Sequence, residues 1–260
     1  MKIAVQGCGN WGKNWVRVLG DIIGEENVVK VDPNVDGCIP EVPYDEVDAV
    51  VIATPSSSHC HLGLLALWAG KHVMIEKPMA LTCADAIDLV GMANHKNVVL
   101  MTNHIMLVHP AYRKIKARLP FGSINALRAV RHGSKQRSEG VIWNLAPHDL
   151  SMAFDLMGEP LSLDRHDSTL IATWQNAIGV FDYEADTEKR REFYVFSGPS
   201  HFSLVDNELS FFGEHIPCDD DEPLRLMAEA FIRSCKSGVA EVSSGESALP
   251  IIRLLEEVTS

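Results

Sequence analysis

The stretch Gly7-Cys8-Gly9-Asn10-Trp11-Gly12, preceded by the apolar run Ile3–Gln6, narrows the fold of this 260-residue chain more than any other segment. The apolar run predicts a strand, and a helix-like segment follows the glycines. In a strand–turn–helix unit, the glycines of G-x-G-x-x-G permit a tight turn, a close approach of the backbone to a pyrophosphate, and close packing of the helix on the sheet. Amide groups at the start of the helix would then hold the diphosphate. We expect the cofactor to contact Gly7, Gly9, Asn10, Trp11 and Gly12, although Trp11 is equally suited to packing.

Asp32 indicates which dinucleotide binds. It closes the second apolar run, about 20 residues after the glycines. A carboxylate at this place accepts hydrogen bonds from both ribose hydroxyls and repels a 2′-phosphate. Pro33 and Asn34 follow it, so no adjacent arginine neutralises such a phosphate. The sequence therefore favours NAD over NADP as the cofactor.

Residues 1–103 alternate between short apolar runs and helix-like segments. The runs are apolar on both faces, as buried parallel strands are, and the alternation predicts a doubly wound Rossmann sheet. The crossover between Asp32 and Asp48 carries Pro33, Pro40 and Pro43, so we expect an extended loop there and no helix. The expected strands are 3–6, 28–32, 48–54, 72–76 and 98–102, and the expected helices are 12–23, 59–70 and 82–95.

Residues 104–260 show strand-like segments in succession, separated by short polar turns. The chain is therefore expected to be an α/β protein, with a Rossmann domain over 1–103 and an α+β domain with a mostly antiparallel open sheet over 104–260. Because an open sheet face needs cover, we expect a homodimer or homotetramer built through that sheet. The expected strands are 124–131, 169–174, 178–183, 192–196, 202–205 and 209–212, and the expected helices are 110–118, 147–157, 223–236 and 246–258.

The composition disfavours several classes of protein. A net charge of −12, from 23 basic and 35 acidic side chains, argues against a nucleic-acid partner. No apolar run reaches the roughly 20 residues of a membrane span, and the residues after Met1 do not form a signal peptide. We expect a cytoplasmic protein with no membrane partner. The six cysteines are dispersed without a C-x-x-C pair, so neither a metal site nor a disulfide framework is expected.

Four further motifs resemble those of one family. Ala53-Thr54-Pro55 with His59 resembles A-T-P-x-x-x-H, and the stretch from Gly70 to Pro78 resembles G-K-H-V-x-x-E-K-P. His109-Pro110-Ala111-Tyr112 resembles the entry to that family's second domain. The stretch from Trp143 to Leu150, W-N-L-A-P-H-D-L, is close to a W-D-L-A-P-H-D-L pattern. The chain is thus similar to the glucose–fructose oxidoreductase/inositol dehydrogenase group (Gfo/Idh/MocA), clearly over 1–158 and less closely beyond.

The resemblance implies an oxidoreductase with Lys77, His148 and Asn144 as its catalytic residues. Lys77 would contact the nicotinamide ribose and a substrate hydroxyl and stabilise the developing alkoxide, while His148 would take the hydroxyl proton. Glu76 is expected to be more structural than binding, and Pro78 to fix a turn with a possible cis bond before it. The other expected cofactor contacts are Thr54, Pro55, His59, Glu76, Lys77 and Asn103. The expected substrate contacts are Lys77, His104, Tyr112, Arg131, Trp143, Asn144 and His148, although aromatic residues are more often core.

The sequence departs from the family pattern at residue 144, where aspartate is usual. Asparagine can orient a hydroxyl, but it cannot accept a proton. The family's usual helix in the 33–47 crossover is also missing, and the chain is shorter than expected, so loops over the substrate pocket are expected to be trimmed.

A basic cluster suggests the charge of the substrate. Five basic residues lie within a stretch of ten residues, although the chain as a whole is acidic. Their side chains would suit a diphosphate or a carboxylate, but an ordinary solvated loop would explain the cluster equally well. We therefore expect a small-molecule substrate such as a sugar nucleotide or uronic acid. The five residues are Arg128, Arg131, His132, Lys135 and Arg137.

Three functions stay open on the sequence. The leading one is an NAD-dependent oxidoreductase acting on a carbinol or ketone of a sugar, sugar nucleotide or cyclic polyol. The second is a catalytically inactive NAD-binding sensor or partner subunit, which the asparagine at position 144 suggests. The third is a reductase for an imine or another non-sugar double bond on the same scaffold.

Overall fold

The computed structural model describes residues 1–119, 122–134 and 138–260, which form two compact units. Unit 1 comprises Met1–His104 and Glu222–Ile252, and unit 2 comprises Ile105–Asp221 and Arg253–Ser260. Residues 222–252, which the sequence places in the second domain, therefore belong to unit 1. The reason is packing: helix α6 (Pro223–Ser237) lies against helix α1 (Gly12–Ile23), and Thr102 N donates to Ser243 O at 2.9 Å.

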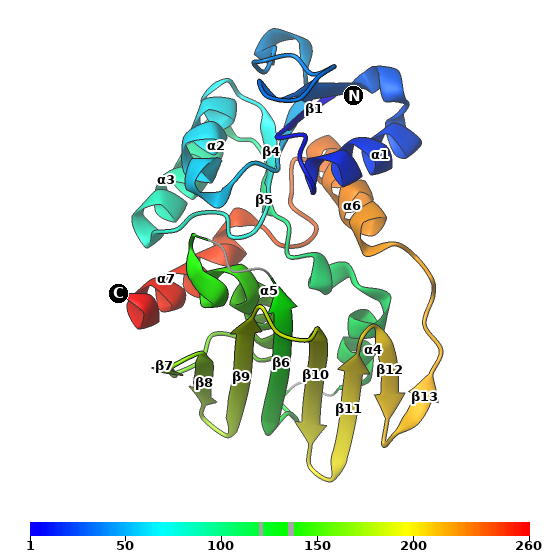
Figure 1. Cartoon of the computed structure of the whole chain (residues 1–260), viewed down its shortest axis with the longest axis vertical. Helices are drawn as coiled ribbons and strands as arrows, with labels where there is room; N and C mark the ends of the chain where they lie inside the picture. Colours follow the sequence, from blue (N-terminus) through cyan, green and yellow to red (C-terminus); the bar gives the residue numbers. More distant parts are fainter. Residues whose placement is uncertain (120–121, 135–137) are drawn as a thin grey trace. The chain divides into compact units, whose positions relative to one another are not determined.

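Unit 1 contains a five-stranded sheet whose strands are all parallel (Figure 1). Its order, β2-β1-β3-β4-β5, confirms the predicted doubly wound arrangement. The bounds are β1 (Ile3–Gln6), β2 (Val28–Val31), β3 (Ala49–Ile52), β4 (His72–Ile75) and β5 (Leu100–Thr102). Most of these side chains are fully buried, as the runs of valine and isoleucine predict.

Helices cover both faces of this sheet, α1 and α6 on one side and α2 (His59–Trp68) and α3 (Cys83–Lys96) on the other (Figure 1). Thr82 caps α3, because its Oγ1 accepts from Asp85 N at 3.1 Å. The 33–47 crossover forms no α-helix, as its prolines predict. It contains the single 3₁₀ turn η2 (Tyr44–Glu46), and Ile39 pairs with Val31 beside β2. Two further 3₁₀ turns are η1 (Glu25–Asn27) and η3 (Ser56–Ser58).

Unit 2 contains an eight-stranded sheet of order β13-β12-β11-β10-β6-β9-β8-β7. Every neighbouring pair is antiparallel except β6 and β9, so the predicted mostly antiparallel sheet is confirmed. Two strands, β7 and β13, were not expected from the sequence. The bounds are β6 (Ala126–Ser134), β7 (Ser162–His166), β8 (Thr169–Trp174), β9 (Ala177–Ala185), β10 (Arg190–Ser197), β11 (Ser200–Val205), β12 (Glu208–Phe211) and β13 (Glu214–Ile216).

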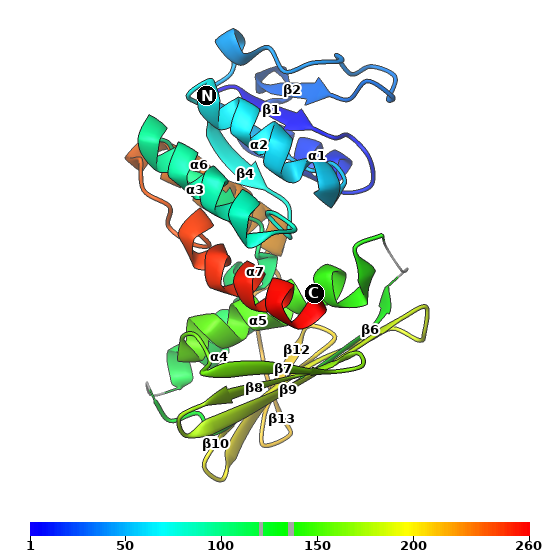
Figure 2. The ribbon, with the colours of Figure 1, turned by 90° about the vertical axis from the view of Figure 1, so that its left-hand side faces the viewer.

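Helices α4 (Pro110–Arg118) and α5 (Gly140–Met157) lie over one face of this sheet (Figure 2). The 3₁₀ turn η4 (Ile105–Val108) precedes α4, and α7 (Gly245–Thr259) contributes its last residues to unit 2. Helix α5 begins at Gly140, not at the predicted Pro147. Proline is favoured in the first turn of a helix, yet here Pro147 lies inside the helix.

The buried ion pair between Arg131 and Asp149 fixes α5 on the sheet. Arg131 Nη2 donates to Asp149 Oδ1 at 2.7 Å and its Nε donates to Oδ2 at 3.0 Å. The Asp149 side chain is fully buried and Arg131 is nearly so. Removing one partner of such a pair leaves an uncompensated buried charge, which costs about 3–5 kcal/mol. The pair therefore fixes the position of Asp149, and with it the middle of α5.

Candidate functional site

The glycine turn between β1 and α1 fits the close approach of a cofactor. Gly7 has a φ of +92°, and a Cβ there would lie 2.8 Å from the Ala53 carbonyl carbon. A Cβ on Gly12 would lie 1.6 Å from Gly7 O, so neither position tolerates a side chain. A Cβ on Gly9 would meet nothing within 4 Å, which leaves open space above the turn. The loop thus presents bare backbone at the start of a helix, as a pyrophosphate requires. Gly9, Asn10 and Trp11 are the exposed residues of this loop.

Backbone N–H groups of the neighbouring residues hold the Asp32 carboxylate in place. Its Oδ2 accepts from Cys8 N at 2.9 Å and its Oδ1 accepts from Asn34 N at 2.9 Å. Each carboxylate oxygen keeps a lone pair for a further donor, because an ionised carboxylate offers about four acceptor sites. Cys8 lies beside it, and burial, followed by an interaction with Cys38, raises the pKa of the Cys8 thiol to about 12. Cys8 is therefore a neutral neighbour of the carboxylate.

His59 joins the loop after β3 to the segment after β4. Its Nε2 lies 2.9 Å from Thr54 O and its Nδ1 lies 2.8 Å from Pro78 O. The imidazole is almost completely buried, and the Lys77–Pro78 peptide bond is cis, as the sequence suggested. Thr54 Oγ1 accepts from Ser58 Oγ at 2.8 Å, and Pro55 is exposed. His59 therefore supports the backbone on either side of the site.

Glu76 ties three elements of unit 1 together at the carboxyl end of β4. Its Oε1 accepts from Trp15 Nε1 of α1 at 2.8 Å and from Asn103 Nδ2 at 2.7 Å. Because a carboxylate only accepts, it must bind the Nδ2 side of the Asn103 amide. Asn103 Oδ1 is consequently turned away, and this buried atom has no hydrogen-bond partner among the described residues. These contacts support the expectation that Glu76 is structural, and they leave Asn103 Oδ1 as an acceptor for a bound group.

His104 and Ser243 form a buried pair beside Lys77. Ser243 Oγ lies 3.0 Å from His104 Nδ1, and Ser243 adopts the left-handed conformation with a φ of 52°. Burial, followed by the charge of Lys77, lowers the pKa of His104 to about 4. The imidazole is therefore neutral at physiological pH. Sequence reasoning missed Ser243, because it is 139 residues from His104 and lies in no motif.

In unit 2, Asn144 and His148 lie four residues apart on α5 and share one face of that helix. Asn144 is buried, and His148 is partly exposed. Ser151 Oγ donates to His148 O at 2.9 Å. Asp149, the next residue, is the one that Arg131 anchors. The structure thus brings together the two candidate catalytic residues of unit 2.

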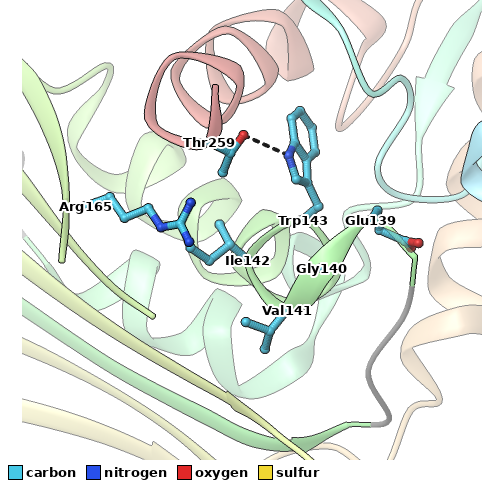
Figure 3. A pocket seen from close by; sticks show the side chains of 7 residues that line it. All are labelled: Glu139, Gly140, Val141, Ile142, Trp143, Arg165 and Thr259. Carbon is cyan, nitrogen blue, oxygen red and sulfur yellow. Dashed lines mark hydrogen bonds between the residues drawn. The ribbon is translucent and has the colours of Figure 1, made fainter. Parts of the chain in front are cut away.

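Trp143 lines a cavity of about 220 Å³ at the start of α5 (Figure 3). Its Nε1 donates to Thr259 Oγ1 at 3.0 Å, and Arg165 lies across from it. Trp143 is itself buried, at 8% exposed, and its role as a substrate contact stays a prediction. The other lining residues are Glu139, Gly140, Val141 and Ile142.

Two of the expected substrate contacts are buried and already engaged within unit 2. Tyr112 is fully buried, and its hydroxyl donates to Met152 O at 3.2 Å and to Asp155 Oδ2, so it has no surface to offer a ligand. Arg131 directs its guanidinium at Asp149, so its first role is to anchor α5. Lys135 and Arg137 lie outside the described residues. Within the described residues, no group of three or more His, Cys, Asp or Glu side chains is placed to hold a metal ion, and no helix is long and apolar enough to cross a membrane.

Comparisons with known proteins agree with this architecture. Residues 23–104 match a family model described as an oxidoreductase family with an NAD-binding Rossmann fold. A UDP-N-acetylglucosamine 3-dehydrogenase from Acidithiobacillus ferrooxidans is 39% identical over 135 residues, which cover 50% of this chain and 41% of that enzyme. The match therefore spans less than half the length of that enzyme.

Solved structures extend the likeness in fold to the whole chain. A UDP-N-acetylglucosamine 3-dehydrogenase from A. ferrooxidans has a TM-score of 0.87 at 24% identity, covering 100% of this chain and 95% of that one. A 3-ketoreductase from Actinomadura kijaniata, solved with TDP-benzene and NADP, has a TM-score of 0.82 at 18% identity, covering 100% and 97%. Both share the two-part fold described above.

The low pKa of His104 predicts a specific loss of stability in acid. The pKa falls from its usual 6.5 in the unfolded chain to about 4 in the folded protein. The folded state therefore resists a proton that the unfolded state accepts. The resulting stability, about 3 kcal/mol, is fully present above pH 6.5 and is lost as the pH falls towards 4. Urea unfolding between pH 4 and 7.5 should show a weaker acid dependence for His104→Gln than for the wild type. His95→Gln, at an exposed position of α3, is the control, and parallel curves for all three proteins would contradict the assignment.

Proposed function

We propose that this chain, which belongs to the Gfo/Idh/MocA family of oxidoreductases, is an NAD-dependent dehydrogenase or reductase acting on a carbinol or ketone of a sugar nucleotide. The observation that carries the proposal is the bare glycine turn with Asp32 fixed against Cys8 N. That arrangement combines space for a diphosphate with a carboxylate for a ribose. The orphaned acceptor Asn103 Oδ1, at the carboxyl end of β5, supports it independently.

The choice of NAD over NADP rests on charge. The carboxylate of Asp32 is held by two backbone N–H groups, so it cannot swing away from a 2′-phosphate without losing both bonds. A phosphate there would meet a fixed negative charge. The Actinomadura kijaniata neighbour was solved with NADP, so the preference is a property we assign to this chain from its own loop.

The names of the relatives indicate the class of substrate that we propose. One relative is named for a UDP-sugar, and one structural neighbour holds a TDP derivative. Sugar nucleotides carry a diphosphate, which complements cationic side chains even in a protein of net charge −12. We infer a sugar nucleotide as the preferred substrate over an uncharged polyol.

Individual residues have distinct roles in the proposed reaction. A bound nicotinamide would accept or supply the hydride. Lys77 would hold the substrate oxygen and stabilise its negative charge, and His148 would exchange the hydroxyl proton. Asn144, on the same face of α5 as His148, would orient the hydroxyl through its amide. Glu76 and Asp149 would act through their neighbours, as positioning residues.

A non-catalytic NAD-binding protein is the second candidate, and Asn144 is the residue that favours it. An amide at this position cannot replace a carboxylate as a proton acceptor. If proton transfer needed a carboxylate there, the protein would bind NAD and turn nothing over. The variants described below separate the two functions.

We further propose that unit 2 assembles into a dimer or tetramer through the sheet face opposite α4 and α5. Alternate residues of β10 pack beneath the helices, whereas Tyr194 and Phe196 lie half-buried on the other face. A line of rings continues from them to His201 at 5.8 Å and Phe212 at 5.5 Å. Ile178 is 46% exposed and Phe212 is 52% exposed. A second copy of the sheet would cover these side chains.

Calorimetric titration with NAD(H) and NADP(H) tests the role of Asp32. The wild type should bind NAD(H) more tightly, and Asp32→Asn should lose most of that preference because the charge is removed while backbone contacts can persist. Hydrogen bonds to a charged group contribute about 1.5–3 kcal/mol, or about 10–100-fold in affinity. Asp36→Asn, an exposed position in the same crossover, should change neither affinity. Equal or tighter NADP(H) binding by the wild type would refute the assignment.

Rates with UDP-N-acetylglucosamine and related sugar nucleotides test the catalytic roles. His148→Ala and Lys77→Met should each lower kcat by about 10²–10⁴-fold, as expected for a lost acid–base or charge-stabilising group. Asn144→Asp should change kcat by less than about tenfold if residue 144 only orients the hydroxyl. His95→Ala is the control. An Asn144→Asp gain of several orders of magnitude would favour the non-catalytic function, as would NAD binding with no turnover of any sugar nucleotide.

Sedimentation at micromolar concentration tests the assembly. The wild type should form a dimer or larger species, and Phe212→Glu or Val180→Glu should shift it to monomer by placing charge on the sheet face. Val239→Glu, which is 68% exposed in unit 1, is the matched control. A wild type that is monomeric throughout would rule out this interface.

A further inference from the structure

Three side chains form a row across neighbouring strands of unit 2, on the face that α5 covers. Arg191 of β10 is opposite Arg131 of β6, and Arg131 is opposite Tyr183 of β9. Opposed side chains of the antiparallel pair β10 and β6 lie on the same face, about 4.5–5.5 Å apart at Cβ. Tyr183 is opposed to Arg131 on the parallel strand β9. The row therefore brings two guanidinium groups and a phenol together.

The acid that faces this row neutralises only half of its charge. Asp149 binds Arg131 through both carboxylate oxygens, at 2.7 Å and 3.0 Å. Among these side chains, two arginines and one aspartate leave one net positive charge, which the nearby Asp206 offsets only in part. The net charge of the whole protein is −12.

Arg191 carries that surplus charge. Among the described residues, no hydrogen bond or ion pair engages its guanidinium, although it is close enough to Arg131 for repulsion. Partial burial, followed by the charge of Arg131, lowers the pKa of Arg191, while Asp206 and Asp149 offset part of this effect. Neither acid comes within ion-pair distance of it. Arg191 is nevertheless an exposed residue, so a ligand can reach it.

Tyr183 adds a second uncommitted donor to the row. Its side chain is fully buried, and its hydroxyl has no hydrogen-bond partner among the described residues. Burial, followed by the charge of Asp149, raises the pKa of this phenol well above its usual value, so the hydroxyl keeps its proton. The cluster therefore holds more donors than acceptors, which is the composition of an anion site.

The position of the row connects it to the proposed chemistry. Asp149 directly follows His148 on α5, so the residue that anchors the row is adjacent to the proposed acid–base group. An arginine fork matches the two oxygens of a phosphate or carboxylate. Because Arg131 is already paired, Arg191 is the member of the row with its fork available.

We propose that Arg191, backed by the Arg131–Asp149 pair, is an anion subsite of unit 2 that receives a phosphate or carboxylate group of the substrate. The subsite rests on the proposed function for its identity as part of a substrate site. It replaces Arg131 as the cation that contacts the ligand, and it gives Arg131 the role of a positioning residue.

Calorimetry on the NAD-loaded full chain tests the subsite with three probes: uridine diphosphate, inorganic pyrophosphate and glucuronate. At least one should bind, and Arg191→Ala should weaken it by about tenfold or more, the effect of losing hydrogen bonds to a charged group. Arg191→Lys keeps the positive charge but lacks the forked guanidinium, so its affinity for the probe should lie between those of the wild type and Arg191→Ala. Arg190→Ala is the matched control, because Arg190 is adjacent, also exposed and paired with Glu192 at 2.7 Å. It should change binding by less than about twofold, as exposed ion pairs contribute little.

The probes distinguish the sources of the anion, and the outcomes separate the subsite from the function. If only uridine diphosphate and pyrophosphate bind in a way that needs Arg191, the group that the subsite receives is a diphosphate. If only glucuronate does so, the group is a carboxylate. If no probe binds, or if binding is the same in Arg191→Ala, the subsite is refuted. Probe binding that needs Arg191, without turnover of any sugar nucleotide, upholds the subsite and refutes the proposed function. Turnover with KM unchanged in Arg191→Ala upholds the function and refutes the subsite.

Discussion

The buried carboxylate of Glu76 is the constraint on which the geometry of unit 1 depends. It is desolvated, and it keeps its place because Trp15 Nε1 and Asn103 Nδ2 both donate to it. Leaving such a group without donors would cost at least the 1–3 kcal/mol of an unsatisfied buried polar atom, and more if charged. The two bonds fix α1, the end of β4 and the end of β5 against one another. Lys77 follows Glu76 directly, so its backbone inherits that fixed position.

A buried carboxylate has the same positioning role in unit 2. Asp149 directly follows His148, and its buried carboxylate is held by Arg131 of the underlying sheet. In both units, then, the residue proposed to act on the substrate is one peptide bond from a buried acid whose partners lie on other elements. A buried charge tolerates little displacement, because any loss of its partners exposes the full desolvation cost. The neighbouring buried acid can thereby fix the position of a partly exposed lysine or histidine that is not itself buried.

The sequence could predict what depends on local pattern. The parallel sheet, the glycine turn and the helix-free crossover follow from periodicity, glycine spacing and proline content. Position in the fold could not be predicted in the same way. Ser243 reaches His104 from a distant segment, and Tyr112 carries a family motif yet is fully buried. The predicted start of α5 was wrong, because proline is typical of a first helical turn whereas Pro147 lies inside this helix.

Burial also gives a physical reason for the asparagine at position 144. Its side chain is only 5% exposed, and the same stretch of α5 already buries the carboxylate of Asp149. A second acid here would be desolvated, and burial would raise its pKa and favour its protonated form. An aspartate at 144 would then offer a hydroxyl and a carbonyl oxygen in place of a charge, which is close to what the amide offers already. The neutral side chain therefore preserves the hydrogen-bonding capacity of this face of α5 without burying another charge, which fits our proposal that His148 exchanges the proton.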